Sequence, residues 1–516
     1  MTDRPPNILL VMVDQLAASW LPAYGHGVVQ APNLTALARE GVVFDAAYCP
    51  SPLCAPSRAS LLTGRLPSRT RVYDNAAEMR ASLPTVTHAL RAAGYATALA
   101  GKMHFVGADQ LHGFEERLTP DVYPAGMDWT PDWRAPLGER LPWYHTMESV
   151  LHPGVSAASM QVDYDDEVRF HAVRALYDHA RARPRDPLFL VASFTSPHDP
   201  WELPPRWWDR YDPAGIPLSD VPSIPLDDAD PHSVRLRAMC GTDAADLSDE
   251  QIRRARHAYF AAISYVDERI GEVLRALTDS GLADDTVVVF TADHGEMLGE
   301  RGLWFKMSFF EDSARVPLVV RGRRGAAPAG TRVGAPVSAL DLAPTLLDLA
   351  GVPHDAEARE GLDGESLVPL LSGTGDGDAA RRRPVVAEYL AEGVTAPMVM
   401  VRRGALKYVR CPGDPEQLYD LDADPRELRN RAGGDRHAEG LAELRAEADR
   451  RWDLEALERD VLDSQRERRV VVPALDRGRH EAWDYVPRAD GAMRYVRSKA
   501  DLYDLQRRAR LDVPRG

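Results

Sequence analysis

Uninterrupted apolar runs alternate with helix-like stretches along the first two thirds of the chain. We predict strands within NILLVMVD (7–14), GYATALAGKMHF (94–105), DPLFLVASFTSPHDP (186–200) and DDTVVVFTADHGE (284–296). Runs without polar alternation are typical of strands buried on both faces of a sheet. Helices are expected at 32–41, with Asn33 as the cap and Gly41 as the stop, and at 341–351. The alternation predicts an α/β fold with a mostly parallel sheet between helices.

Polar side chains that are able to bind ligands or take part in catalysis follow the carboxyl ends of these predicted strands. They are Asp14, Lys102, His104, His198, Asp293 and His294. Ligands bind to open α/β sheets at this edge, because the carboxyl ends of parallel strands meet there. Each residue alone is compatible with an ordinary loop position. Together they predict a site.

The pattern changes after a Gly-, Asp- and Arg-rich linker at 370–384. The segments VVAEYL, MVMVRRGALKYVR and EQLYDLDADPRELRN predict short strands of an antiparallel sheet. We therefore expect three parts: a catalytic domain at 1–375, a smaller C-terminal α+β subdomain at 376–468, and a tail at 469–516.

Composition narrows the range of partners and compartments. A net charge of −16 makes nucleic acid an unfavourable partner. No apolar run approaches the roughly 20 residues of a membrane span, and the start, MTDRPPN, lacks the pattern of a signal peptide. The four cysteines, Cys49, Cys54, Cys240 and Cys411, show no metal-binding spacing and suit a reducing compartment. We expect a cytoplasmic protein.

Cys54 begins the segment CAPSRASLLTGR (54–65). As a thiolate nucleophile it would need a partner base, and Arg58 cannot serve because a guanidinium stays protonated. An arginine can instead lower the pKa of a thiol and bind an anion. A buried structural cysteine is the alternative interpretation.

The segment 54–65 resembles the signature of the formylglycine-dependent sulfatases, a family with the alkaline-phosphatase-like fold. The resemblance implies that a formylglycine-generating enzyme oxidises Cys54 to formylglycine (3-oxoalanine), whose hydrate attacks sulfur. It also implies one divalent metal ion, with Ca²⁺ expected and Mn²⁺ or Mg²⁺ as alternatives. The implied ligands are Asp14, Asp293, His294 and the modified Cys54. The family commonly has two aspartates after its first strand, whereas Gln15 stands second here, which leaves its place among the ligands open.

The same resemblance implies roles for the other motif residues. Arg58 would hold the hydrated aldehyde, and Lys102 belongs to the GKMH motif that also contains His104. His104 would be the base that expels sulfate and regenerates the aldehyde. His198, in SPHDP, and Lys306, in LWFK, would bind sulfate and help to protonate the leaving group.

Longer segments, among them SPLCAPSR, GKMHFVGADQLHGFEERLT and AWDYVPRADGAMRYVRSKADL, resemble the choline-sulfatases within this family. The implied substrate is choline-O-sulfate, whose quaternary ammonium suits aromatic faces and carboxylates. Suitable groups gather at 123–145: Tyr123, Trp129, Trp133, Trp143, Tyr144 and His145. The resemblance places Asn75, Trp129, His145 and Glu388 at the substrate, and Asp501 at a neighbouring subunit's site. A tail used in this way requires a homo-oligomer, such as a dimer or tetramer.

Two other functions remain open at this point. A phosphonate monoester or phosphodiester hydrolase, or another sulfatase of the same superfamily, would share the motif around Cys54, because sulfate and phosphate esters are both tetrahedral anions. A non-catalytic protein that binds choline-like osmolytes is the more distant alternative. The presence of every motif residue named above argues against a non-catalytic protein.

Overall fold

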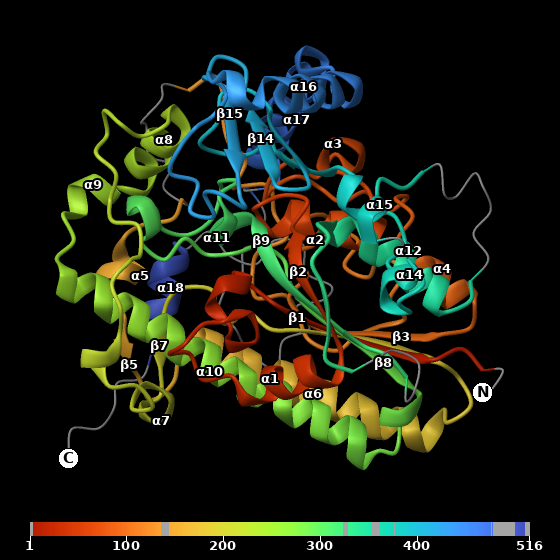
Figure 1. Cartoon of the computed structure of the whole chain (residues 1–516). Coiled ribbons are helices and arrows are strands. Elements are labelled where there is room, and N and C mark those ends of the chain that lie inside the picture. Colours follow the sequence, from red (N-terminus) through yellow and green to blue (C-terminus); the bar gives the residue numbers. More distant parts are fainter. Residues whose placement is uncertain are drawn as a thin grey trace, which may run out of the picture.

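A computed structural model describes residues 4–135, 144–323, 329–352, 361–375, 377–475, 477 and 501–510. Figure 1 shows one large twisted sheet between helices, with a smaller sheet above it. This arrangement confirms the predicted α/β fold with a mostly parallel central sheet.

The central sheet has the strand order β10-β2-β9-β8-β1-β6-β3-β4, and β11 pairs with β2. Its strands are β1 (Asn7–Val13), β2 (Val42–Tyr48), β3 (Ala96–Gly101), β4 (Glu116–Arg117), β6 (Leu188–Ser193), β8 (Thr286–Ala292), β9 (Arg315–Arg321), β10 (Thr331–Val333) and β11 (Val337–Ser338). β1 is parallel to both β6 and β8, and only β9 runs antiparallel to its neighbours. Every residue of β1 and β8 is buried, which explains why the sequence shows no polar alternation there.

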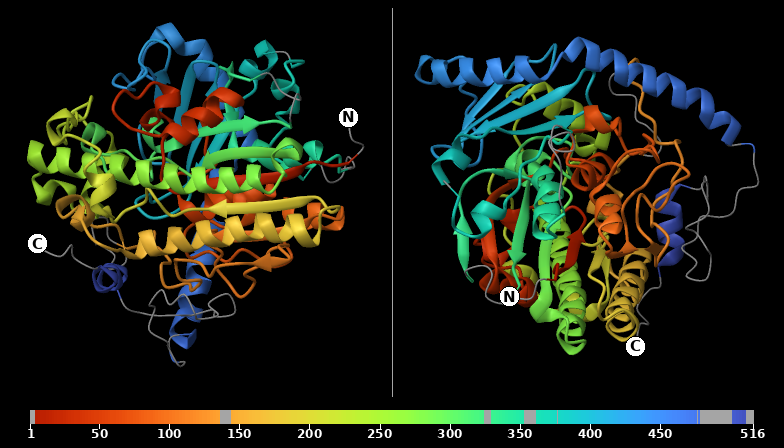
Figure 2. Two further views of the ribbon diagram at one scale, coloured as in Figure 1. Left: turned by 90° about the horizontal axis from the view of Figure 1, so that it is seen from below. Right: turned by 90° about the vertical axis from the view of Figure 1, so that its right-hand side faces the viewer.

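Helices cover both faces of this sheet (Figures 1 and 2). One face carries α1 (Pro32–Glu40), α6 (Met160–Ala182) and α10 (Asp249–Asp279), and the other carries α2 (Cys54–Thr63), α4 (Val86–Ala92) and α12 (Leu342–Leu349).

Gly41 ends α1 as predicted, but Asn33 is not its cap. Proline suits the first helical position, so α1 begins at Pro32, and the Asn33 side chain donates to Asp267 Oδ2 at 2.8 Å instead.

The smaller sheet is antiparallel, with the order β12-β13-β14-β15, as predicted. Its elements are β12 (Val385–Tyr389), β13 (Met398–Arg403), β14 (Leu406–Arg410) and β15 (Gln417–Asp420), followed by α16 (Ala438–Arg451) and α17 (Leu454–Leu475). α17 continues past residue 468, and a buried ion pair ties it to the catalytic domain: Arg468 Nη1 lies 2.6 Å from Asp74 Oδ1. The domain boundaries at 375 and 468 stay predictions.

Shorter elements connect these layers. They are α3 (Pro67–Thr70), α5 (Glu148–Leu151), β5 (Gly154–Val155), β7 (Glu202–Leu203), α7 (Pro205–Trp208), α8 (Pro231–Cys240), α9 (Thr242–Ala245), α11 (Glu311–Ala314), α14 (Val368–Leu371), α15 (Gly377–Arg382) and α18 (Leu502–Ala509). α18 lies beside α5 (Figure 1), where the Thr146 amide donates to the Tyr503 hydroxyl at 3.2 Å. Within the described ranges, no helix is both long enough and apolar enough to cross a membrane.

Candidate active site

The predicted strand-end residues meet at one edge of the central sheet. Asp14 follows β1, Lys102 follows β3, His198 follows β6, and Asp293 and His294 follow β8. None of these five side chains is more than 6% exposed. The parallel order of these four strands brings their carboxyl ends together, as expected for a site in an open α/β sheet.

Cys54 is the first residue of α2 and points into this cluster. Its Sγ lies 3.2 Å from His294 Nε2, 3.6 Å from Lys102 Nζ and 3.8 Å from Asp14 Oδ1. Burial, followed by the negative charge of Asp14, raises the pKa of the Cys54 thiol to about 11. An unmodified cysteine is therefore protonated here near neutral pH and is a weak nucleophile.

The four residues that the sequence indicates as metal ligands lie together. Asp14, Cys54, Asp293 and His294 each offer one ligand atom, and these atoms lie within 4.8 Å of one another. The Gly295 carbonyl lies 3.1 Å from His294 Nδ1, which leaves Nε2 facing the cluster. Burial lowers the pKa of His294 to about 4, so its imidazole is neutral, as metal ligation requires.

Arg58, one turn along α2, holds the two carboxylates of this cluster. Its Nε donates to Asp293 Oδ2 at 2.7 Å and its Nη2 to Asp14 Oδ2 at 3.3 Å, and all three side chains are fully buried. Burial alone would lower the pKa of Arg58, but Asp293 and Asp14 raise it above its usual value. Lys102 Nζ also pairs with Asp14. Burial would raise the pKa of Asp14, yet the positive charges around it, Lys102 foremost, hold the pKa well below its usual range.

His104 is a neutral imidazole with free nitrogens. The Asp121 carboxylate accepts from the Met103 and His104 amides at 3.0 and 2.8 Å, which holds His104 in a left-handed conformation with φ of 54°. Neither ring nitrogen has a hydrogen-bond partner among the described residues. Burial and the charge of Lys102 lower the pKa of His104 to about 3. A neutral ring with open nitrogens can accept a proton.

His198 and Lys306 form a second cationic corner of the site. Lys306 Nζ lies 2.9 Å from His198 Nε2, and His198 Nδ1 lies 2.7 Å from the Asp199 carbonyl oxygen. Because Nδ1 donates to that carbonyl, Nε2 is free to accept from Lys306. The Gln15 side chain is engaged with this pair: its Oε1 accepts from Lys306 Nζ at 2.5 Å.

A cavity opens from this cluster. It is lined by Cys54, Asn75, His104, Tyr123, Trp129, Tyr144, His145, His198, Asp199, Lys306, Glu392, Leu502, Tyr503 and Gln506. Of the predicted substrate contacts, Asn75, Trp129 and His145 therefore lie in the cavity wall. Tyr123 and Tyr144 line it too, whereas Trp133 turns away and donates from Nε1 to the Ala391 carbonyl at 2.6 Å. Trp143 lies outside the described residues.

Glu388 is not brought to the cavity, which corrects its predicted place at the substrate. Its carboxylate accepts from the Ser68 amide and hydroxyl at 2.7 and 2.6 Å and from Trp452 Nε1 at 2.6 Å. Glu388 lies within β12, whereas Glu392 lies in the loop beyond the strand and lines the cavity. The second glutamate of AEYLAEG follows a predicted strand end, a signal that could have identified it.

Asp501 caps α18 rather than lining the cavity of its own chain. Its exposed carboxylate accepts from the Tyr503 and Asp504 amides at 3.0 and 3.1 Å. Other residues of α18, Leu502, Tyr503 and Gln506, line the cavity instead. No sequence signal pointed to Gln506. Contact of Asp501 with a neighbouring subunit stays a prediction.

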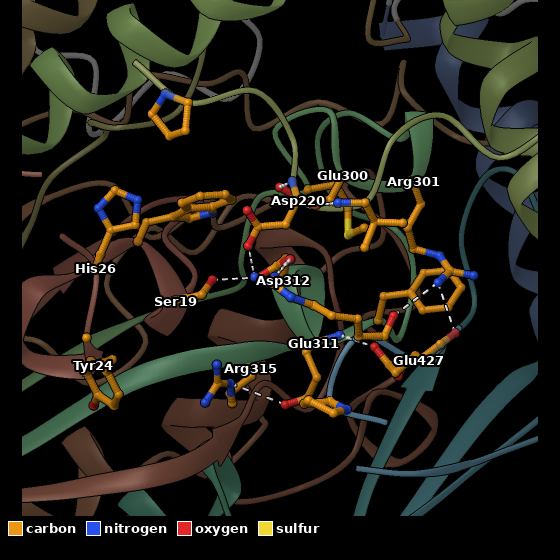
Figure 3. A pocket seen from close by; sticks show the side chains of 18 of the residues that line it. Ser19, Tyr24, His26, Asp220, Glu300, Arg301, Glu311, Asp312, Arg315 and Glu427 are labelled. Atoms are coloured by element: carbon orange, nitrogen blue, oxygen red, sulfur yellow. Dashed lines mark hydrogen bonds and ion pairs between the residues drawn. The ribbon is translucent and has the colours of Figure 1, made fainter. Parts of the chain in front are cut away.

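Figure 3 shows a larger cavity of about 490 Å³, lined by loops that follow β1 and β8. No predicted site residue lines it. Its charged groups are engaged with one another: Arg315 Nε lies 3.2 Å from Glu311, and Arg301 donates to the Glu427 carbonyl at 2.9 Å. The predicted catalytic residues converge on the smaller cavity beside Cys54, which is the candidate active site.

Comparison with known proteins agrees with this site. A family model described as Sulfatase matches residues 6–352, and one described as Choline sulfatase enzyme C terminal matches 459–511. The chain belongs to the sulfatase family, and it is a sulfuric ester hydrolase. Within the family, it is 50% identical to the choline-sulfatase of Rhizobium meliloti (strain 1021), over the full length of both chains.

More distant relatives share the architecture. The human iduronate 2-sulfatase is 30% identical, over 82% of this chain and 77% of that protein. The crystal structure of the phosphonate monoester hydrolase of Agrobacterium radiobacter superposes with a TM-score of 0.67 at 27% identity, over 88% of this chain and 96% of that one. The fold is therefore common to enzymes named for different esters.

Proposed function

We propose that the protein hydrolyses choline-O-sulfate with water to choline and sulfate. The observation that carries this proposal is that two kinds of side chain line one cavity. We call these two groups its polar end and its aromatic end. Cys54, His104, His198 and Lys306 form a polar end suited to a sulfate ester. Trp129 and its neighbours form an aromatic end suited to a quaternary ammonium.

The polar end fits a metal ion and a modified cysteine. Two carboxylates and one neutral imidazole, from Asp14, Asp293 and His294, match the donors that divalent cations take. Together with residue 54 they would hold the ion. The family favours Ca²⁺, with Mn²⁺ or Mg²⁺ as alternatives. Such an ion supplies positive charge for the ester oxygens and lowers the pKa of a bound hydroxyl. Formylglycine at position 54, made by a formylglycine-generating enzyme, supplies the nucleophilic hydroxyl through its hydrate.

The surrounding side chains bind and move protons. Arg58 and Lys102, buried beside the carboxylates, offset the negative charge that gathers when the sulfate enters. His104 takes the proton whose removal expels sulfate, because its ring is neutral and both nitrogens are open. Lys306, whose ammonium donates to His198 Nε2, holds the sulfate from the other side and protonates the choline oxygen as it leaves.

The aromatic end presents ring faces and acceptor oxygens to the quaternary ammonium group. The Trp129 ring lies 5.8 Å from the Tyr123 ring, and both line the cavity. Glu392 Oε2 and Gln506 Oε1 are buried acceptors with no hydrogen-bond partner among the described residues. Burial raises the pKa of Glu392 to about 7. A trimethylammonium group offers positive charge to the Glu392 carboxylate and methyl surface to the aromatic rings, so it suits this wall.

We further propose a cytoplasmic homo-oligomer in which Asp501 reaches a neighbouring subunit. The support comes from the sequence and from the chemistry of its cysteines. All four cysteines are free thiols, which suits a reducing compartment. A phosphonate monoester or phosphodiester hydrolase is the second candidate, because that enzyme of A. radiobacter shares the fold at 27% identity.

The test is sulfate release from choline-O-sulfate by protein co-expressed with the oxidising enzyme. Peptide mass spectrometry first establishes the fraction of Cys54 that carries formylglycine. We expect release in proportion to that fraction and none from Cys54→Ala, which keeps the fold. Release that is absent from fully converted protein, or unchanged in Cys54→Ala, contradicts the proposal.

A further inference from the structure

The amide of Gln15 uses both of its ends within the buried wall of the site. Its Oε1 accepts from Lys306 Nζ at 2.5 Å, and its Nε2 donates to Glu296 Oε2 at 2.6 Å and to Asp199 Oδ1 at 3.3 Å. None of the four side chains is more than 2% exposed. This network holds a residue proposed to act on the substrate.

Chemistry fixes the orientation of this amide. An ammonium only donates, so the oxygen of Gln15 must face Lys306. The amino group of Gln15 is left for the carboxyl oxygens of Glu296 and Asp199. The reversed amide would oppose a donor to the ammonium and an acceptor to each carboxylate.

Glu296 is itself held in place on its other oxygen. Its Oε1 accepts from the Leu298 and Phe305 amides, both at 2.7 Å, so Oε2 remains for Gln15. Phe305 directly precedes Lys306. The Glu296 carboxylate therefore supports Lys306 twice, through its backbone neighbour and through the Gln15 amide.

We propose that Glu296 is a positioning residue, which fixes the Gln15 amide and thereby aims the Lys306 ammonium at His198 and the departing alcohol. This inference rests on the role proposed above for Lys306. It also explains the departure at position 15, where the family commonly has an aspartate. Here that side chain accepts from the lysine ammonium.

Glu296→Gln should reverse the Gln15 amide. The backbone amides of Leu298 and Phe305 require an acceptor, so the new amide oxygen takes the place of Oε1. Its amino group then faces the Gln15 amino group, and Gln15 turns to present a donor to Lys306. In the double variant Gln15→Glu/Glu296→Gln, residue 15 again offers an acceptor to Lys306 and accepts from residue 296. It loses the longer donation to Asp199 Oδ1, 3.3 Å in the wild type, so the recovery is partial.

The experiment compares wild type, Glu296→Gln and the double variant at equal formylglycine content. Choline-O-sulfate, whose leaving group is a poor one, is measured beside 4-nitrophenyl sulfate, whose phenolate leaves readily. We expect Glu296→Gln to lower kcat on choline-O-sulfate about 10- to 100-fold, the effect of losing one charge-assisted hydrogen bond. The loss on the aryl ester should be smaller, and the double variant should recover about tenfold.

Glu300→Gln is the matched control, because Glu300 is also buried and accepts from two amides, those of Asp220 and Val221, at 3.0 and 2.8 Å.

Equal losses on both esters, or a double variant no better than Glu296→Gln, overturn the proposal in favour of a purely structural anchor. Thermal unfolding identifies a variant that fails to fold. In that case Gln15→Leu, which has no atom to accept from Lys306, is measured instead, and full activity on choline-O-sulfate overturns the proposal. If the wild type cleaves only the aryl ester, the proposed substrate fails. The fall in kcat in Glu296→Gln and its recovery in the double variant are then measured on the aryl ester. Failure of the proposed substrate and failure of the role of Glu296 are therefore distinguishable.

Discussion

Replacing Trp129 with leucine removes the aromatic face that we assign to the trimethylammonium group. The Trp129 ring lies 5.9 Å from the ring of His104 and 5.8 Å from that of Tyr123, so it adjoins both the proposed base and another ring of the aromatic end. A desolvated cation–π contact contributes about 2 kcal/mol. Its loss corresponds to about a 30-fold fall in kcat/KM for the cationic ester.

The assay separates charge from contact area. Choline-O-sulfate is compared with 3,3-dimethylbutyl sulfate, in which an uncharged carbon replaces the ammonium nitrogen. Leucine removes similar apolar contact from both esters, so the ratio of their kcat/KM values isolates the charge. We expect that ratio to fall about 30-fold in Trp129→Leu. Trp208→Leu should leave it unchanged, because Trp208 stacks on His257 and does not line the cavity.

An equal loss on the two esters would refute the reasoning. It would mean that Trp129 contributes shape and apolar area alone, and that the cation is recognised elsewhere. Measurement of the same ratio in Tyr123→Leu would then show whether the neighbouring ring carries the effect.

Three further predictions concern charge, stability and the metal. Because burial raises the pKa of Glu392 to about 7, its carboxylate gains a proton as the pH falls through 7, and KM for choline-O-sulfate should rise there. In Glu392→Gln that pH dependence of KM should disappear, and its persistence would contradict the assignment. Arg468→Met leaves Asp74 buried and unpaired, so urea denaturation should show a loss of about 3–5 kcal/mol in unfolding free energy. Asp74→Asn/Arg468→Met should lose less, and an equal loss would mean that the pair adds nothing. Removal of divalent ions by a chelator should abolish sulfate release, and separate additions of Ca²⁺, Mn²⁺ and Mg²⁺ should identify the ion that restores it. Full activity of metal-free protein would exclude the proposed metal.

The central sheet and the catalytic cluster were predictable because local patterns encode them. The apolar runs of β1 and β8 end directly at Asp14 and Asp293, so a strand prediction alone placed both carboxylates at one edge. The segment that begins at Cys54 is compact and distinctive.

The rest of the site depends on tertiary packing. Glu388 and Glu392 are four residues apart, and only the end of β12 decides which of them lines the cavity. Gln15 meets Asp199 across 184 residues of chain and Lys306 across 291. No spacing rule connects positions so far apart, and the same holds for Gln506 on α18.

The central claim is that a formylglycine-dependent site cleaves the sulfate ester of choline. The most direct measurement is kcat/KM for choline-O-sulfate beside phosphocholine and an aryl sulfate, on protein whose formylglycine content is known. Strong preference for choline-O-sulfate over both is the predicted result, because the polar end would then select the ester and the aromatic end the alcohol. Preference for phosphocholine or for the aryl sulfate would contradict the assignment of the substrate.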